Sequence, residues 1–132
     1  MAVTSMADDS RIFGLNVTGG GVGISVINAT NTRVDNSAIR NTASDGLYIE
    51  CSTAILENTF IADVGGDGDG DGDGDGDGDG LSILGGYVEL NRSGIDNSAG
   101  DGFTILLGLA SISQSVVNNT GSSGVVVSGS EV

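Results

Sequence analysis

The sequence predicts an all-β protein whose chain winds into a stack of similar coils, and two observations lead to this prediction. A glycine followed by an apolar residue, any residue and a second apolar residue recurs in five copies at nearly constant spacing. The repeats begin at Gly23, Gly46, Gly80, Gly102 and Gly124, so the numbering advances by 23, 34, 22 and 22 from each glycine to the next. Apolar and polar residues alternate at a period of two, and no helical apolar periodicity persists. Such a repeat is typical of folds in which each coil packs on its neighbours.

The size and charge of the chain limit its partners. The 132 residues leave room for one domain, with a formal net charge of −14, four Arg, no Lys and no His. Nucleic acid is not expected as a partner, because neutralising phosphates requires clustered Lys or Arg, and anionic membrane surfaces would repel the chain. No segment approaches the ~20 apolar residues of a membrane helix, so no membrane insertion is expected. The charge favours cationic or neutral partners or metal ions, and its simplest role is solubility.

One coil can be followed from Gly46. Alternation divides it into three short strands separated by two bends and a return turn. The residues that share a face are Leu47, Ile49 and Cys51 in the first strand, Ala54 and Leu56 in the second, and Thr59, Ile61 and Asp63 in the third. Cys51 is the single cysteine, so it has no internal disulfide partner. We expect it to face inward as a small buried apolar residue.

The other coils match this register position by position. Apolar residues recur at four positions of the coil and predict four columns inside the stack: Ile24, Leu47, Leu81, Phe103 and Val125; Val26, Ile49, Ile83, Ile105 and Val127; Val34, Leu56, Leu90 and Ile112; and Ile39, Ile61, Ile95 and Val117. Each strand is expected to pair in parallel with its copy about 4.8 Å away. Ile12 and Val17 fit the same columns, so residues 12–22 are expected to end an earlier coil.

Two polar columns are equally regular. One consists of hydroxyl side chains and the other of Asn or Asp at the bend after the third strand: Ser37, Thr59, Ser93 and Ser115; and Asn41, Asp63, Asn97 and Asn119. A stacked Asn can donate to and accept from its neighbours, and it tolerates the left-handed backbone of a sharp corner. The Asn column is therefore interpreted as holding the corner of the coil, with a ligand site as the alternative.

Segments such as 34–41 followed by 45–49 resemble the right-handed parallel β-helix repeat family, the pectin lyase-like group, and the resemblance extends from about Arg11 to Val127. It implies a single-stranded right-handed parallel β-helix, or β-solenoid, of about five to six coils of 22–23 residues. Residues 1–10 are expected to form an N-terminal tail, and residues 11–132 the β-helix domain. The family includes polysaccharide lyases, hydrolases, epimerases, phage tailspikes and noncatalytic surface proteins, so the resemblance leaves function open.

The outer face of the first strand is where the resemblance would place an active site. Its two columns are Ser25, Tyr48, Ser82, Thr104 and Val126, and Ile27, Glu50, Leu84, Leu106 and Ser128. They contain no carboxylate pair for glycoside cleavage and no histidine, so the chain is expected not to be an enzyme. The same face offers an apolar strip that is predicted to contact a partner: Ile27, Tyr48, Leu84, Leu106 and Val126.

The step from Gly46 to Gly80 is longer than the others and contains a low-complexity Gly-Asp loop at residues 67–80. Removing twelve residues from it restores the regular repeat. The carboxylates of the loop suggest a site for Ca²⁺, the one cofactor considered: Asp67, Asp69, Asp71, Asp73, Asp75, Asp77 and Asp79. The loop does not match the EF-hand pattern, because the acid at the twelfth position is missing. It does not match the glycine-rich calcium-binding nonapeptide either. Weak, non-stoichiometric binding of divalent cations is the expectation that remains.

The leading functional hypothesis is a noncatalytic structural or surface module that self-associates, for example as part of a filament or appendage. No cap is recognisable at either end of the predicted stack, which suggests either a fragment of a longer helix or copies stacked end to end. An extracellular or cell-surface location would suit this role, although residues 1–10 show no signal peptide. The alternatives are a carbohydrate-binding or carbohydrate-processing module, with Tyr48 stacking on a sugar of a polysaccharide, and a calcium-responsive element built on the Gly-Asp loop.

Overall fold

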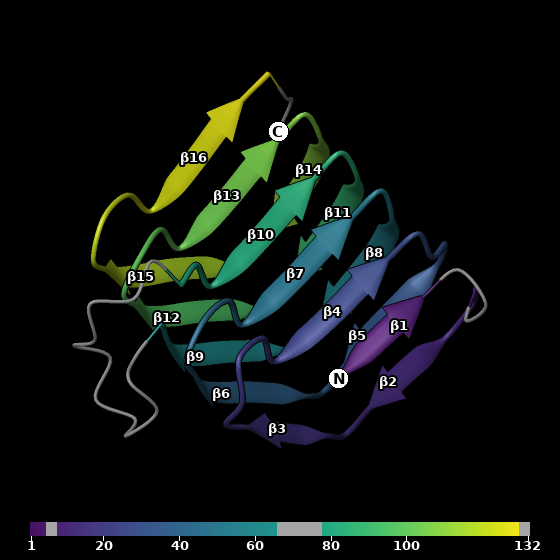
Figure 1. The fold of residues 1–132 in the computed structure, drawn as a ribbon, viewed down its shortest axis with the longest axis horizontal. Coiled ribbons are helices and arrows are strands. Elements are labelled where there is room, and N and C mark those ends of the chain that lie inside the picture. The colour runs from purple at the N-terminus through teal and green to yellow at the C-terminus, as the bar shows by residue number, and fades with distance from the viewer. Residues whose placement is uncertain (5–7, 66–77, 130–132) are drawn as a thin grey trace.

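The computed structural model describes residues 1–4, 8–65 and 78–129, with the backbone alone for residues 3 and 4. These residues form sixteen β-strands and no helix, and hence no helix that could cross a membrane. The strands wind into a solenoid with three parallel sheets as its sides (Figure 1). The predicted all-β stack of parallel coils is therefore confirmed.

We call the three sides sheets A, B and C, after the order in which the chain enters them. Sheet A contains β1 (Ala2–Thr4), β4 (Ile24–Ile27), β7 (Leu47–Glu50), β10 (Leu81–Leu84), β13 (Phe103–Leu106) and β16 (Val125–Ser128). Sheet B contains β2 (Arg11–Phe13), β5 (Thr32–Asp35), β8 (Thr53–Glu57), β11 (Tyr87–Asn91) and β14 (Leu109–Ser113). Sheet C contains β3 (Asn16–Thr18), β6 (Ala38–Thr42), β9 (Phe60–Val64), β12 (Gly94–Ser98) and β15 (Val116–Thr120).

The four predicted apolar columns form the core. Ile24 lies opposite Leu47, Leu47 opposite Leu81, and Leu81 opposite Phe103, and all four side chains are fully buried. Ile12 pairs with Val34 and Val17 with Ile39, which confirms that an earlier coil continues the columns. At the other end the columns reach the surface, because no described strand lies over β16.

The glycine that opens each repeat is required by close packing. A Cβ on Gly46 would come within 2.3 Å of Ile61 Cγ2, and a Cβ on Gly80 within 2.2 Å of Ile95 Cγ2. The glycine Cα therefore lies directly against the apolar side chain on the third strand of its own coil. Gly124 has no such neighbour within 4 Å, because no described third strand follows it.

The corners of the coil are made by residues with left-handed backbone, as predicted for the Asn column. Asn41, Asp63 and Asn97 have φ angles of 55°, and Asn119 has a φ of 47°. Each lies one residue before the end of its third strand, slightly earlier than the predicted bend. The amide of Asn97 donates to Asp63 Oδ1 at 2.8 Å, so part of this column is joined by side-chain hydrogen bonds.

Cys51 corrects one prediction, because its side chain is exposed. Its φ of 46° makes it a left-handed corner residue that ends the alternation of β7. The inward position passes to Ser52, whose hydroxyl donates to the carbonyl oxygens of Val26 and Glu50 at 3.2 and 2.6 Å. The residues at this corner in the other coils also have positive φ: Asn28, Gly85, Leu107 and Gly129.

The hydroxyl column is confirmed, with its hydrogen bonds going to backbone groups. Thr59 Oγ1 donates to the carbonyl of Val34 at 3.0 Å, while the Thr59 N–H donates to Ser93 Oγ at 3.1 Å. The Ser93 N–H donates to Ser115 Oγ at 3.1 Å in the same way. Each hydroxyl in this series therefore joins one coil to the next at the corner between sheets B and C.

The N-terminal segment differs from the predicted tail. Ala2, Val3 and Thr4 form β1, which pairs in parallel with β4 and places Ala2 opposite Ser25. The stack thus begins within the segment 1–10 that was expected to lie outside it. Alternation over three residues was too short a signal to identify this strand.

Candidate functional site

The predicted contact strip on the outer face of sheet A is divided between two columns. Tyr48 lies opposite Ser25 and Ser82, whereas Ile27 lies opposite Glu50. Only Leu84 and Leu106 are direct neighbours within the strip. Of the five strip residues, Leu106 alone is among the exposed large apolar residues, and Ile27, Tyr48, Leu84 and Val126 are half-buried. The structure therefore does not gather the five predicted residues into one continuous apolar surface.

Tyr48 and Glu50 form a local pair on this face. The Tyr48 hydroxyl donates to Glu50 Oε2 at 3.1 Å. Partial burial, and then the hydrogen bond to Glu50, raises the pKa of Tyr48 above its ordinary value. Tyr87 makes the same contact to Glu89 at 2.8 Å on sheet B, which also raises the pKa of Tyr87. Both phenols stay protonated near neutral pH and act as hydrogen-bond donors.

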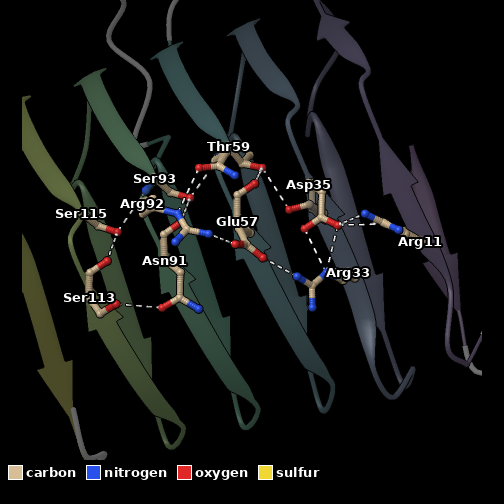
Figure 2. Close-up of polar contacts among 12 residues, drawn as sticks. Arg11, Arg33, Asp35, Glu57, Thr59, Asn91, Arg92, Ser93, Ser113 and Ser115 are labelled. Carbon is tan, nitrogen blue, oxygen red and sulfur yellow. Dashed lines mark hydrogen bonds and ion pairs between the residues drawn. The ribbon is translucent and has the colours of Figure 1, made fainter.

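A chain of ion pairs crosses the outer face of sheet B (Figure 2). Arg11 Nη2 lies 2.8 Å from Asp35 Oδ2, and Arg33 Nε lies 2.9 Å from the same oxygen. Arg33 also pairs with Glu57, which in turn pairs with Arg92. The series Arg11, Asp35, Arg33, Glu57 and Arg92 therefore connects β2, β5, β8 and the corner after β11.

The buried carboxylate of Asp35 indicates that the ion pairs stabilise the fold. The Asp35 side chain is only 4% exposed, and two guanidinium groups surround it. The remaining arginine, Arg40, lies over the ring of Phe60 at 5.4 Å from the ring centroid. All four arginines thus have a partner within the protein, a carboxylate for Arg11, Arg33 and Arg92 and an aromatic ring for Arg40.

Reasoning from single residues missed this ion-pair chain, although the repeat contains a signal for it. Arg11 lies opposite Arg33, and Asp35 lies opposite Glu57. Stacking like charges directly over one another is unfavourable. The column of Arg11 and Arg33 lies beside the column of Asp35 and Glu57, so each arginine can pair diagonally with a carboxylate of the next coil. Comparing the two columns in the sequence would have predicted these pairs.

A second ladder of acids holds the return turn into sheet A. The Asp79 N–H donates to Asp45 Oδ1 at 3.0 Å, and the Asp101 N–H donates to Asp79 Oδ1 at 2.8 Å. The Ser123 N–H donates to Asp101 Oδ1 at 2.8 Å. Burial raises the pKa of Asp45, whereas the backbone N–H of Ser123 lowers the pKa of Asp101.

This ladder gives a structural role to the last acid of the Gly-Asp loop. Asp79 Oδ1 accepts from the Asp101 N–H, and Asp79 Oδ2 accepts from the Ser82 hydroxyl at 3.2 Å. The other predicted calcium ligands, Asp67 to Asp77, lie outside the described residues. Within residues 1–4, 8–65 and 78–129, no three His, Cys, Asp or Glu side chains form a group that could hold a metal ion.

The open end of the solenoid is its most distinctive surface. Val125 and Val127 occupy inward positions on β16, yet they are 44% and 43% exposed, whereas the matching Phe103 and Ile105 are fully buried. β14, β15 and β16 are the outermost strands of the three sheets at this end. Each pairs with a described strand on one side only, so this end exposes apolar side chains and unpaired strand edges side by side.

The match to a known family agrees with the fold of the described residues. A family model described as a right-handed beta helix region matches residues 3–132, which is nearly the entire chain. A search of curated proteins found no match. The chain belongs to the right-handed β-helix family.

Proposed function

We propose that this protein is a noncatalytic structural module that self-associates through the ends of its solenoid, as a short unit of a fibre or surface appendage outside the cell. The observation that carries the proposal is the exposure of Val125 and Val127 at positions that are buried in β4, β7, β10 and β13. Covering those side chains with a further coil removes apolar surface from water and satisfies the strand edge in the same step.

The outer faces support a structural role. The arginines of sheet B pair with carboxylates of the same sheet, and the two tyrosines donate to neighbouring glutamates. The ion pairs Arg11–Asp35 and Arg33–Glu57 join consecutive coils, whereas each tyrosine–glutamate hydrogen bond lies within a single strand. The net charge of −14 opposes lateral approach of two copies, whereas contact through the end covers Val125 and Val127, so we expect the solenoid to grow along its axis.

Ionic strength provides the first test. Copies with a net charge of −14 repel one another, and salt screens this repulsion while leaving apolar contacts in place. We expect light scattering to show particles that lengthen as protein and salt concentrations rise, and negative-stain microscopy to show rods of constant width. Monodisperse particles of single-chain mass under all conditions, with and without calcium, would exclude the proposal.

A matched pair of variants tests whether the open end is responsible. Val127→Asp puts a carboxylate into an inward position of β16, whereas Ser128→Asp adds the same charge at the outward-facing neighbour. The valine is already 43% exposed in the single chain, so both variants are expected to fold. Assembly should be lost in Val127→Asp and retained in Ser128→Asp. Equal assembly of the two variants would place the interface elsewhere.

A further inference from the structure

The three sides of the solenoid contain unequal numbers of strands. Sheet A has six strands, and sheets B and C have five each. The additional strand is β16, which begins a coil whose second and third strands are not present among the described residues (Figure 1). At the other end, β1, β2 and β3 form a first coil with one strand in each sheet.

The unequal strand numbers create a conflict in sheet A when two copies stack end to end. A second copy that pairs its β2 with β14 and its β3 with β15 brings its own β1 to the place in sheet A that β16 already fills. Two strands then compete for one position. If both strands stayed in sheet A, sheets B and C would each have a one-strand gap at the junction.

We propose that the junction forms by strand exchange, in which β16 of one copy displaces β1 of the next copy and pairs with its β4. This inference rests on the proposed self-association and specifies its interface. β16 is the better strand for the position: it pairs with β13 along four residues, whereas β1 pairs with β4 along three. β16 also provides three consecutive valines, and β-branched residues favour strands over the alanine of β1.

The columns of the two ends are compatible in this arrangement. Val125 and Val127 would lie over Ile24 and Val26 of the next copy, following the register that relates each strand of sheet A to its neighbour. In sheet B, Ile112 would meet Ile12 of the next copy, and in sheet C, Val117 would meet Val17. All of these residues belong to the apolar columns, so the junction repeats the contact between consecutive coils of one chain.

Gly124 provides an independent feature of the same junction. Within the chain, a Cβ on Gly102 would come within 2.2 Å of Val117 Cγ1, whereas a Cβ on Gly124 would meet no atom within 4 Å. In the exchanged junction, Val17 of the next copy takes the place over Gly124 that Val117 takes over Gly102. Among the described residues no side chain packs over Gly124, and the exchanged junction provides one.

Disulfide trapping distinguishes exchange from simple stacking. In a Cys51→Ser background, Val126→Cys is combined with Ser25→Cys in one protein and with Ala2→Cys in another. Val126 would lie directly opposite Ser25 of the next copy after exchange, and opposite Ala2 if β1 stayed in place over β16. Within one molecule four strand spacings of about 4.8 Å separate positions 25 and 126, so any disulfide between them joins two copies.

Under mild oxidation we expect the 25/126 protein to form covalent multimers and the 2/126 protein to remain largely uncrosslinked. The opposite pattern, or assemblies in which neither pair crosslinks, would overturn strand exchange and leave self-association standing. Absence of crosslinks together with single-chain particles by light scattering would overturn both proposals. A protein carrying Val126→Cys alone controls for collisions between identical positions.

Gly124→Ala tests the junction without cysteines. We expect assembly to fall at least tenfold, because the added methyl group lies where Val17 of the next copy must pack. The melting temperature of the dilute single chain should not change, because a Cβ at position 124 would meet no atom within 4 Å there. Unchanged assembly of Gly124→Ala would overturn the exchanged junction, since a junction that retains β1 over β16 leaves this glycine uncovered.

Discussion

Gly65 and Gly78 lie against each other, although twelve residues separate them along the chain: a Cβ on Gly78 would come 2.5 Å from the Cα of Gly65. One coil further on, Ala99 and Gly100 occupy the matching places as consecutive residues. The Ala99 N–H donates to the carbonyl of Val64, and the Gly100 N–H donates to that of Gly78, both at 2.9 Å. The insertion therefore interrupts the coil at one peptide link and leaves the coil itself unchanged.

Deletion of residues 66–77 should give a protein that folds with a coil of the ordinary length. We expect the free energy of unfolding to be unchanged or higher by about 1 kcal/mol, because the loop no longer has to be closed. Urea denaturation followed by circular dichroism measures this. A loss of more than about 2 kcal/mol would mean that the insertion contributes contacts to the fold.

The predictable part of this fold is the part governed by alternation. The apolar columns follow from a period of two that recurs in every coil, and their buried side chains confirm it. The corner at Cys51 could not be predicted in this way, because cysteine carries no preference for the left-handed backbone that it adopts. Asn41 and its equivalents were predicted as corners because asparagine does carry that preference.

The candidate sites were less predictable, because they depend on contacts between columns. Asp35 and Arg33 are two residues apart, but their role is defined by Arg11 and Glu57 in neighbouring coils. The exposure of Val125 could not be inferred from its identity, since the same position is buried in β4, β7, β10 and β13. The ion pairs depend on which coils are neighbours, and the exposure of Val125 depends on β16 being an outermost described strand of sheet A.

The glycines that open the repeats predict that the same Gly→Ala substitution changes the free energy of unfolding at one position and not at another. Gly80→Ala should lower the free energy of unfolding by about 1–3 kcal/mol, because its methyl group would overlap with Ile95. Gly124→Ala should be neutral within about 0.5 kcal/mol at concentrations where the protein is a single chain. Chemical denaturation of both variants provides the comparison. Equal stability of the two would show that close approach is not the reason for the glycines.

The corner column predicts a stabilising change at Leu107. This side chain is 67% exposed and its φ is 56°, a conformation that is costly for leucine and tolerated by asparagine. Leu107→Asn should raise the free energy of unfolding by about 1 kcal/mol. Gly85→Ala, at the matching corner with a φ of 64°, should lower it by a similar amount. Changes of the same sign in both variants would contradict the role assigned to these corners.

The ion pairs of sheet B predict a loss of stability when the buried carboxylate is neutralised. Asp35→Asn should lower the free energy of unfolding by about 2 kcal/mol, because Arg11 and Arg33 would lose their charged acceptor. Asp96→Asn is the control, since Asp96 accepts from the Asn119 amide at an exposed site. Thermal and urea unfolding at neutral pH measure both. An Asp35→Asn protein as stable as the control would mean that the pairs contribute nothing measurable.

The acid ladder predicts opposite pH effects at two aspartates. Burial raises the pKa of Asp45 above its ordinary value of 3.8, so the stability contributed by its neutral form is present below pH 3.8 and lost as pH rises through the raised pKa. The Ser123 N–H lowers the pKa of Asp101 below 3.8, so its contribution is present above pH 3.8 and lost as pH falls through the lowered pKa.

Isosteric substitution separates these two effects. Asp45→Asn should be more stable than the parent at pH 7, and Asp101→Asn should be less stable, because each change removes the charged form of its carboxyl group. The difference for Asp45 should shrink as pH falls through the raised pKa of that group, and the difference for Asp101 should shrink only below pH 3.8, as pH falls toward its lowered pKa. Urea denaturation at pH 3, 5 and 7 measures the two curves. Parallel curves for the parent and Asp45→Asn would show that burial of Asp45 does not penalise its charge.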